Sequence, residues 1–594
     1  MRAFRVNFEG WILPYKEETA VKWIMKYAYW LILTVFLGSI MLFGLSNTAV
    51  EELRFYVGNE DRKEIIEIYT SENGLSYVFL PSYAQMDQVT VAFPTDRKLF
   101  LGGIELKNGA ACSAFSLNQE YEFRIGEQNG VIQFCRSANM PTLYIETRSG
   151  DMKQIYADKE HEEATSIVLY SPEGDVAYRD RNCLLKGRGN STWLQDKKPF
   201  LLRLSDEADL LGMGEDSDWI LLANDHDESN LHNKLLFDLA NRACETWTPQ
   251  CEYVDVYLNG QYNGLYLLAE KVESGINRLN IDIGAGDFLC TVDFSTREET
   301  LENPFQTAYG RTIAICEPNI LGEEAKERIR ELVNQQERIL SSQKDMTQSP
   351  LVDIRSWACK YLVDEIAGNT DADLSSSYFY YSDGVFYGGP VWDYDMAFGN
   401  TVQSHYPKAF IAKNHVKYRS FYSLYYSTLF QNAYFFEKMS EIYKNDFLPV
   451  LTQMIEYDIQ DIADRISAAA MMNQLRWPIQ VNENYEIDPW ARYVNSAESI
   501  IEYLKERTAF LNSALIDKVP YCTVQFEHYV EDYYWTVSVP RGSVLKETDA
   551  VNAPLYAEVD GFVWSIEGTD RVFNPDEPVM EDMVLSRNTI SGQN

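Results

Sequence analysis

The order of apolar and polar residues along the chain predicts several structural regions in succession. From residue 51 to residue 140, short alternating runs such as 77–80 (YVFL) and 121–125 (YEFRI) are separated by turn residues, a pattern typical of β-strands. After residue 141, strand patterns such as 254–258 alternate with helical ones. We therefore expect a β-rich domain at 51–140 and a larger α+β domain at 141–518.

Helical spacing is clearest in four stretches, 229–243, 323–341, 353–366 and 496–515. In 353–366 the apolar residues recur every three or four positions, and Gly368 supplies a C-terminal stop. A polar loop can therefore begin after Gly368. Beyond residue 519 the pattern returns to short strands, which predicts a separate β-module at 519–594.

Near the N-terminus, residues 27–45 form an almost purely apolar stretch of about the length that crosses a bilayer as a helix. Basic residues precede it and Glu51 and Glu52 follow it, so the positive-inside rule puts residues 1–26 in the cytoplasm and the main body outside the cell. This predicts a single-pass protein of the cell membrane. A signal peptide cleaved after Ala49 is the alternative, and either segment would export the body.

The charge and the cysteines narrow the choice of partners. The formal net charge is -37 and is spread along the chain, so binding to nucleic acid is not expected. The nine cysteines include no Cys-x-x-Cys pair, which argues against a zinc ribbon. Cys112 with Cys135, and Cys244 with Cys251, are close enough in sequence to form disulfides in an oxidising compartment, and the sequence leaves both pairings open.

Candidate chemistry is concentrated in residues 368–400. A loop presents Asp371, a hairpin follows at 378–387, and Asp393 and Asp395 then stand two residues apart in an aromatic setting, where a strand would turn both to one side. Phosphoryl transfer needs a carboxylate that orients the attacking hydroxyl and further oxygen ligands for Mg²⁺. Asp371 fits the first role, and Asp393 with Asp395 fits the second. Turn capping or calcium binding by these carboxylates is the alternative.

A glycine-rich turn at 186–190 is a candidate phosphate cradle, with Lys198 or Arg188 as its cation. An ordinary β-turn beside a basic surface is the competing interpretation. Glu270 ends a predicted hairpin strand, and in a kinase-like site it would pair with the phosphate-binding Lys198. A solvent-facing glutamate at a strand end is equally compatible with the pattern.

Together, five blocks resemble the CotH kinase family, which is named for a spore coat protein. They are KGRGNSTW with KKPF, WILLANDHDESNLHNKL, VYLNGQYNGLYLLAEKV, GNTDADLSSSYFYY and GPVWDYDMAFGN. The resemblance implies an atypical protein-kinase-like core that transfers phosphate from ATP to serine or threonine of proteins. It implies Asp371 as the catalytic aspartate, Asp393 and Asp395 as ligands of Mg²⁺ or Mn²⁺, and a cofactor site with Lys198, Glu270 and Arg188.

The chain departs from the family pattern at residues 375–377, where serines stand in place of an expected asparagine. The C-terminal module resembles the β-grasp repeats of the Listeria-Bacteroides type found on bacterial surface proteins. We therefore expect an α+β protein with a kinase-like core between an N-terminal β-domain and a small β-grasp-like module. Its function would be phosphorylation of surface or secreted proteins. The alternatives are a catalytically inactive kinase-like surface scaffold, a cell-envelope binding protein or a glycan-associated protein.

Overall fold

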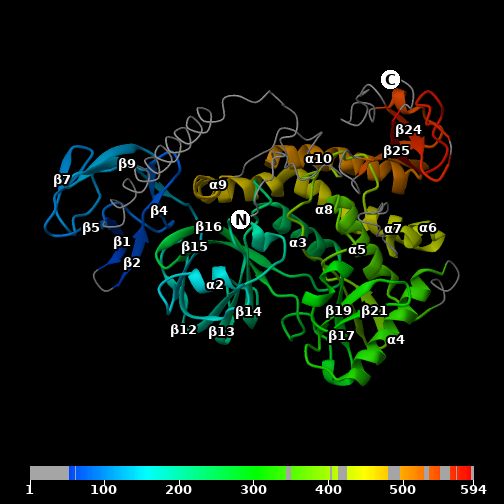
Figure 1. The fold of residues 1–594 in the computed structure, drawn as a ribbon, viewed down its shortest axis with the longest axis horizontal. Helices are drawn as coiled ribbons and strands as arrows, with labels where there is room; N and C mark the ends of the chain where they lie inside the picture. Colours follow the sequence, from blue (N-terminus) through cyan, green and yellow to red (C-terminus); the bar gives the residue numbers. More distant parts are fainter. Residues whose placement is uncertain are drawn as a thin grey trace, which may run out of the picture. The chain divides into compact units, whose positions relative to one another are not determined.

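The structure of the protein is a computed structural model. It describes residues 53–59, 62–342, 349–401, 404–412, 425–478, 496–527, 534–548, 562–569 and 571–589. The chain forms two compact units, one made of residues up to Val78 together with Gln85–Phe134, and one made of Phe79–Ala84 together with Cys135–Asn594. Figure 1 shows the course of the described elements.

The first unit consists of β-sheet, as the alternating pattern predicted. One sheet has the order β2–β1–β5 and the other β3–β4–β9–β8–β6–β7. Their strands are β1 (Arg54–Asn59), β2 (Arg62–Glu67), β3 (Tyr69–Thr70), β4 (Leu75–Leu80), β5 (Thr90–Ala92), β6 (Leu99–Leu101), β7 (Ile104–Leu106), β8 (Glu120–Ile125) and β9 (Gln128–Arg136). Buried side chains such as Phe55, Phe123 and Phe134 fill its interior.

The second unit begins with a closed barrel of seven strands in the order β10–β11–β12–β13–β14–β16–β15. The strands are β10 (Thr142–Thr147), β11 (Glu163–Tyr170), β12 (Val176–Gly187), β13 (Phe200–Asp209), β14 (Glu215–Leu222), β15 (Cys251–Leu258) and β16 (Gln261–Glu270), with the short helix α2 (Lys153–Ala157) after β10. A parallel pairing of β10 with β15 closes the barrel. Inward residues such as Leu143, Leu202 and Trp219 form its own core, as expected where side chains alternate along each strand.

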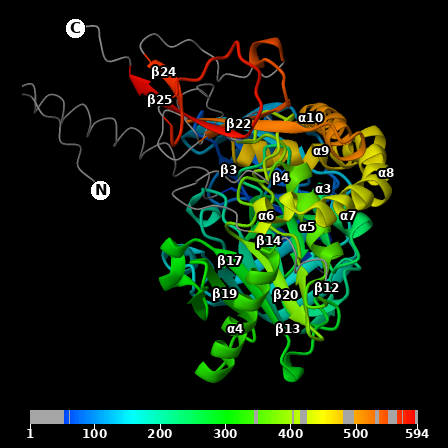
Figure 2. The same ribbon diagram turned by 90° about the vertical axis from the view of Figure 1, so that its right-hand side faces the viewer.

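A five-stranded sheet and two central helices follow. The sheet has the order β18–β19–β17–β20–β21, with β17 (Phe288–Asp293), β18 (Pro304–Gln306), β19 (Thr312–Glu317), β20 (Ser377–Ser382) and β21 (Val385–Gly388). Helices α4 (Glu323–Leu340) and α5 (Ile354–Ala367) belong to this region, and α3 (His232–Ala243) packs against α5. Figure 2 shows the sheet and these helices from the side. Trp357 and Tyr361 of α5 lie in the core that these elements share.

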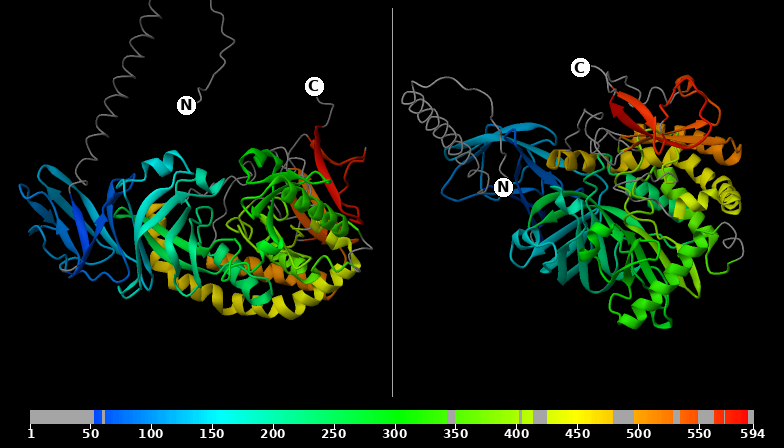
Figure 3. Two further views of the ribbon diagram at one scale, coloured as in Figure 1. Left: turned by 90° about the horizontal axis from the view of Figure 1, so that it is seen from below. Right: turned by 45° about the vertical axis from the view of Figure 1, so that its right-hand side comes forward.

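Helices α6 (Tyr425–Gln431), α7 (Ala433–Ile442), α8 (Leu448–Gln453), α9 (Ile459–Arg476) and α10 (Ala497–Leu511) form the remaining helical part, with π-helical turns at Tyr443–Phe447, Met454–Asp458 and Asn512–Ile516. In Figure 3, α9 and α10 are the two long helices drawn in yellow and orange. Ser496 caps α10 through the backbone N–H of Ser499, which confirms the predicted start of that helix.

The end of α9 holds the β15–β16 hairpin of the barrel. Gly264 lies in the left-handed region with φ +111°, and a Cβ there would stand 2.5 Å from Asn473 Oδ1. Three hydrogen bonds connect the two elements: Leu265 N donates to Asn473 Oδ1 (3.1 Å), Arg476 Nε to the Tyr262 carbonyl (3.2 Å) and Trp477 Nε1 to the Asn263 carbonyl (2.8 Å). We call this group of contacts the α9 clasp.

The C-terminal part is a sheet of order β23–β22–β25–β24, with β22 (Tyr521–Glu527), β23 (Tyr534–Pro540), β24 (Phe562–Ile566) and β25 (Met583–Thr589). Strand β22 pairs antiparallel with β23 and parallel with β25. This confirms strands after residue 519, and the relation to β-grasp repeats stays a prediction.

Two of the sequence predictions concern the membrane segment and the cysteines. The apolar stretch 27–45 lies outside the described residues, and among the residues described no helix has the length and apolarity of a membrane span. All nine cysteines are free thiols. The possible bonds Cys112–Cys135 and Cys244–Cys251 are therefore not formed, and Cys251 is instead buried in the barrel wall of β15, opposite Ala269.

Candidate active site

The loop that carries Asp371 begins where α5 ends. Gly368 adopts the left-handed conformation with φ +64° and caps the helix, as its position in the sequence predicted. The Asn369 side chain then accepts a hydrogen bond from the backbone N–H of Asp371 at 3.0 Å. The carbonyl of Asp371 in turn accepts from the N–H groups of Leu374 and Ser375. This tight turn leaves the Asp371 side chain exposed.

The segment with Asp393 and Asp395 is a loop. Asp393 has φ +72°, and this left-handed residue exposes its side chain while its aromatic neighbours Trp392 and Tyr394 are buried. Asp395 is only 9% exposed. The two carboxylates therefore differ in exposure, and the same-side arrangement that a strand would give does not apply, because Asp393 has a left-handed backbone in a loop.

The start of α3 holds this loop in place. Asn233 Oδ1 accepts from Tyr394 N at 2.9 Å, and His232 Nδ1 donates to the Asp395 carbonyl at 2.8 Å. Asp227 accepts from the His232 backbone N–H at 2.8 Å, and its Oδ1 lies 3.4 Å from His232 Nε2. The helix thus starts at His232 rather than at Ser229, which instead donates to Asp227. These anchoring residues fix the carboxylate loop to the start of α3 and to the turn that precedes it.

The carboxylates of these segments act on one another electrostatically. Desolvation by the surrounding protein raises the pKa of Asp371 to about 6, and the nearby charge of Asp393 adds to this effect. The pKa of Asp395 lies well above its usual range because the group is buried and because Asp393, Asp227 and Asp371 are close to it. Four acidic groups therefore share one small region, which is the charge arrangement that favours a bound cation.

Two arginines border the acidic group. Arg188 lies over the ring of Trp392 with 5.3 Å between its guanidinium carbon and the ring centroid. Burial lowers the pKa of Arg188, whereas Asp393 counteracts this shift. Arg297 donates to Asp293 Oδ1 and to Ser375 Oγ at 3.2 and 3.1 Å, and its charge lowers the pKa of Asp371. The structure therefore brings the predicted residues Arg188, Asp371, Asp393 and Asp395 together.

The predicted ion pair between Lys198 and Glu270 is not formed. Lys198 Nζ donates to the carbonyls of Trp193 and Gln195 in its own turn. Glu270 is fully buried, pairs with Arg278 at 2.6 Å and accepts from the Gln250 N–H. Burial raises the pKa of Glu270 to about 7 even with Arg278 beside it. The predicted pair is therefore wrong, because Lys198 is held by carbonyls of its own turn and Glu270 by Arg278.

The neighbouring Lys197 is the buried lysine of this turn, with 1% of its surface exposed. Lys197 Nζ donates to the carbonyls of Ala223 (2.7 Å) and Leu265 (2.5 Å) and lies over the ring of Tyr266. Burial lowers the pKa of Lys197 to about 7, while Asp225 acts in the opposite direction. The KKPF motif could have suggested Lys197 as readily as Lys198.

Asn400 is a site residue that the sequence reasoning missed. Its Nδ2 donates to the His226 carbonyl at 2.6 Å and contacts the Asp395 carbonyl at 3.4 Å. Its Oδ1 is buried and has no hydrogen-bond partner among the residues that the structure describes. Ser375, in the region where an asparagine was expected, is bonded to Asp293 and Arg297. Asn400 therefore offers the amide oxygen that the serines at 375–377 lack.

The oxygen donors of this site fit a hard divalent cation. Among the described residues, no three His, Cys, Asp or Glu side chains already converge in a metal-binding arrangement. However, oxygen donors are what Mg²⁺ and Mn²⁺ prefer, and Asp393, Asp395 and the unpartnered Asn400 Oδ1 supply them. Mg²⁺ keeps several ligands from water and phosphate, so a partial protein set is sufficient.

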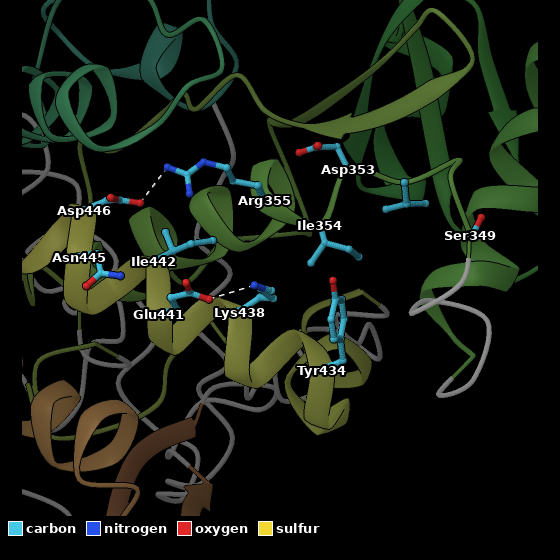
Figure 4. A pocket seen from close by; sticks show the side chains of 11 residues that line it. Ser349, Asp353, Ile354, Arg355, Tyr434, Lys438, Glu441, Ile442, Asn445 and Asp446 are labelled. Carbon is cyan, nitrogen blue, oxygen red and sulfur yellow. Dashed lines mark hydrogen bonds and ion pairs between the residues drawn. The ribbon is translucent and has the colours of Figure 1, made fainter.

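A separate pocket of about 530 Å³ lies at the other end of α5. Asp353, which caps α5, lines it together with Arg355, and α7 and the following π-helical turn form the opposite wall, as Figure 4 shows. Its charges are paired, with Arg355 on Asp446 and Lys438 on Glu441. Because α5 has 14 residues, about 20 Å of helix separates this pocket from the Asp371 loop.

The fold and the site define an α+β protein in which a β-barrel meets a helical half at a group of carboxylates. A family model described as CotH kinase protein matches residues 185–511, more than half of the chain. The chain belongs to the CotH kinase family, as its motifs suggested, and membership suggests an atypical kinase that uses ATP. A comparison with curated proteins gives no match.

Proposed function

We propose that the protein is a metal-dependent atypical kinase that transfers the γ-phosphate of ATP to a serine or threonine hydroxyl of another protein. The observation that carries this proposal is the placement of the exposed Asp371 beside Asp393 and the buried Asp395. A carboxylate that can accept a proton and a separate set of oxygen ligands are the two requirements of phosphoryl transfer, and family membership supports the same activity.

Each residue has a defined role in this proposal. Asp371 orients the acceptor hydroxyl and accepts its proton, and its raised pKa places it near the range where a carboxylate works as a base. Asp393, Asp395 and Asn400 would hold Mg²⁺ or Mn²⁺, which supplies positive charge against the phosphates. Arg188 and Arg297 add fixed positive charge on either side. Hydrogen bonds that join His232 and Asn233 of α3 to the backbone of the Asp393–Asp395 loop keep this arrangement in place before the substrate arrives.

The location of the protein is part of the same proposal. The apolar segment 27–45 with its flanking charges supports a single-pass anchor in the cell membrane, with the main body outside the cell. The acceptors would then be surface or secreted proteins. Since the chain carries a formal charge of -37, basic acceptors would approach it more readily than acidic ones.

The alternative function is a kinase-like scaffold that does not turn over. Ser375 favours it, because this residue binds Asp293 and Arg297 and does not supply the asparagine ligand expected after the catalytic aspartate. Asn400 is the compensating residue under the kinase proposal.

A transfer assay separates the two functions. The full-length chain, purified in mild detergent, is incubated with radiolabelled ATP, Mg²⁺ or Mn²⁺, and myelin basic protein as a basic acceptor. We expect wild-type label on the acceptor and loss of at least about 10²-fold in Asp371→Asn and Asp393→Asn. Asp383→Asn, in the exposed hairpin turn, is the matched control and keeps full activity. A wild-type chain that binds ATP with metal yet transfers no phosphate supports the scaffold instead.

A further inference from the structure

The second carboxylate of the catalytic loop, Asp373, points away from the site. It has φ +58° and is 1% exposed, in contrast to the exposed Asp371 two residues earlier. Its carboxylate forms a bidentate ion pair with Arg311. Nη2 of Arg311 donates to Asp373 Oδ1 at 2.8 Å, and Nη1 donates to Oδ2 at 3.3 Å. Nη2 also donates to the Asp373 backbone carbonyl at 2.7 Å. One guanidinium thus fixes both the side chain and the backbone of this residue.

Arg311 is itself held in a buried socket. Its guanidinium lies over the ring of Tyr425 at 4.3 Å, and its Nε is 3.8 Å from Glu337 of α4. Tyr425, the first residue of α6, donates its backbone N–H to Asp373 Oδ2 at 3.0 Å and its hydroxyl to Glu337 at 2.9 Å. The socket therefore joins α4, α6, the residue before β19 and the loop. The planar fork of arginine makes this bidentate contact rigid, and lysine cannot reproduce it.

The loop is fastened on both sides of Asp371. Before it, Asn369 Nδ2 donates to Asp364 Oδ1 at 3.0 Å. After it, Asp373 binds Arg311, and Ser375 Oγ donates to Asp293 Oδ1 at 3.1 Å. Asp371 is the exposed residue between these fixed points. Since Asp373 is only two residues from Asp371, we expect the position of the Asp371 carboxylate to depend on the contact with Arg311.

We infer that Asp373 and Arg311 are positioning residues that hold Asp371 against the acceptor hydroxyl. This inference rests on the proposed kinase function. In the step concerned, the bond between the γ-phosphorus and the bridging oxygen of ATP breaks and ADP leaves. A bond forms between the acceptor oxygen and phosphorus, and the hydroxyl proton passes to Asp371. Water needs less orientation than a protein side chain, so a loosened Asp371 lowers transfer to the acceptor more than it lowers hydrolysis of ATP.

The test compares the full-length wild type with Asp373→Asn, Arg311→Lys and Arg311→Met, using ATP with Mg²⁺ and myelin basic protein. Three quantities are measured: the affinity and stoichiometry of ATP binding, the rate of phosphate transfer, and the ratio of phosphate transferred to phosphate released into water. Arg330→Lys is the matched control, because Arg330 makes an exposed ion pair with Glu327 on α4.

For Asp373→Asn and Arg311→Met we expect unchanged ATP affinity at one site per chain, a transfer rate lower by about 10²-fold, and a lower ratio of transfer to hydrolysis. Arg311→Lys falls between these variants and the wild type, and the double variant of Asp373→Asn with Arg311→Lys loses no more than the worse single change.

Two results would overturn the inference while leaving the kinase function intact. One is an Asp373→Asn variant that keeps the wild-type rate of phosphate transfer and the wild-type ratio of transfer to hydrolysis. The other is a fall in binding stoichiometry that accounts for the whole loss of transfer at a constant ratio, since this shows only a smaller folded fraction. A wild-type chain that transfers no phosphate overturns the proposed function, and the inference with it.

Discussion

The buried pair of Glu270 and Arg278 gives the sharpest test of the barrel as described. Both side chains have no solvent exposure and stand 2.6 Å apart. We expect Glu270→Ala to destabilise the protein severely without acting on nucleotide binding, because it leaves the buried Arg278 charge with only the longer contact to Asp216 as an ion pair. If Glu270 instead positioned Lys198 at a phosphate, the same change would weaken ATP binding and leave stability nearly unchanged.

The expected magnitude follows from the surroundings of Arg278. Its guanidinium lies 4.8 Å from the Trp219 ring centroid, and its Nε and Nη2 have no hydrogen-bond partner among the described residues. Asp216, at 3.6 Å from Nε, is too far to replace Glu270 by a hydrogen bond. Breaking a buried ion pair from one side costs about 3–5 kcal/mol, which is roughly a thousandfold in the folding equilibrium at 4 kcal/mol.

Urea unfolding followed by tryptophan fluorescence measures this cost, at pH 8 so that Glu270 is ionised above its raised pKa. The double variant Glu270→Met with Arg278→Met removes both charges and should recover most of the lost stability. The reasoning is refuted if Glu270→Ala stays within about 1 kcal/mol of the wild type, or if the double variant is less stable than either single one.

Further predictions concern the site. Because the pKa of Asp371 is raised to about 6 and a base must be ionised, kcat/KM should fall as the pH drops through about 6. Arg297→Gln removes a positive charge that lowers the pKa of Asp371, so the fall in kcat/KM should move to higher pH. Asp293→Asn removes a negative charge that raises this pKa, so the fall should move to lower pH. Shifts of the two variants in the same direction would contradict the role of Asp371 as the base. Asn400→Ala should weaken Mg²⁺ activation by about 10-fold or more, measured as the metal concentration for half-maximal transfer, and an unchanged value would exclude this ligand. Arg188→Ala should raise KM for ATP with a smaller effect on kcat, measured by initial rates.

The local pattern of apolar and polar residues was sufficient to predict most of the helices and strands. The predicted helix 353–366 differs from α5 by one residue at each end, because apolar periodicity and the glycine stop act within one stretch of chain. The hairpin before Asp393 was predicted on the same grounds, and β20 and β21 confirm it. Strands on both sides of the core domain were also expected from alternation alone.

Contacts between residues that are distant in the sequence could not be predicted from the local pattern. Lys197 and Lys198 are adjacent and chemically identical, and only the path of the chain against Ala223 and Leu265 decides which of them is buried. The left-handed backbone conformation of Asp393 cannot be read from a pattern of residue types. Asn400 gains significance only because its amide is fixed on His226, which is 174 positions away in the sequence.

The α9 clasp has a consequence for how substrates enter and leave. Three hydrogen bonds tie the last turn of α9 and Trp477 to the hairpin of the barrel, and Gly264 lets the two backbones approach closely. Enzymes whose two domains rotate apart to admit a substrate need a hinge segment that can change its backbone conformation. A rotation that separated the barrel from α9 would first have to break these three hydrogen bonds, at about 0.5–1.5 kcal/mol each, so we expect local loops to carry much of the motion that nucleotide exchange requires.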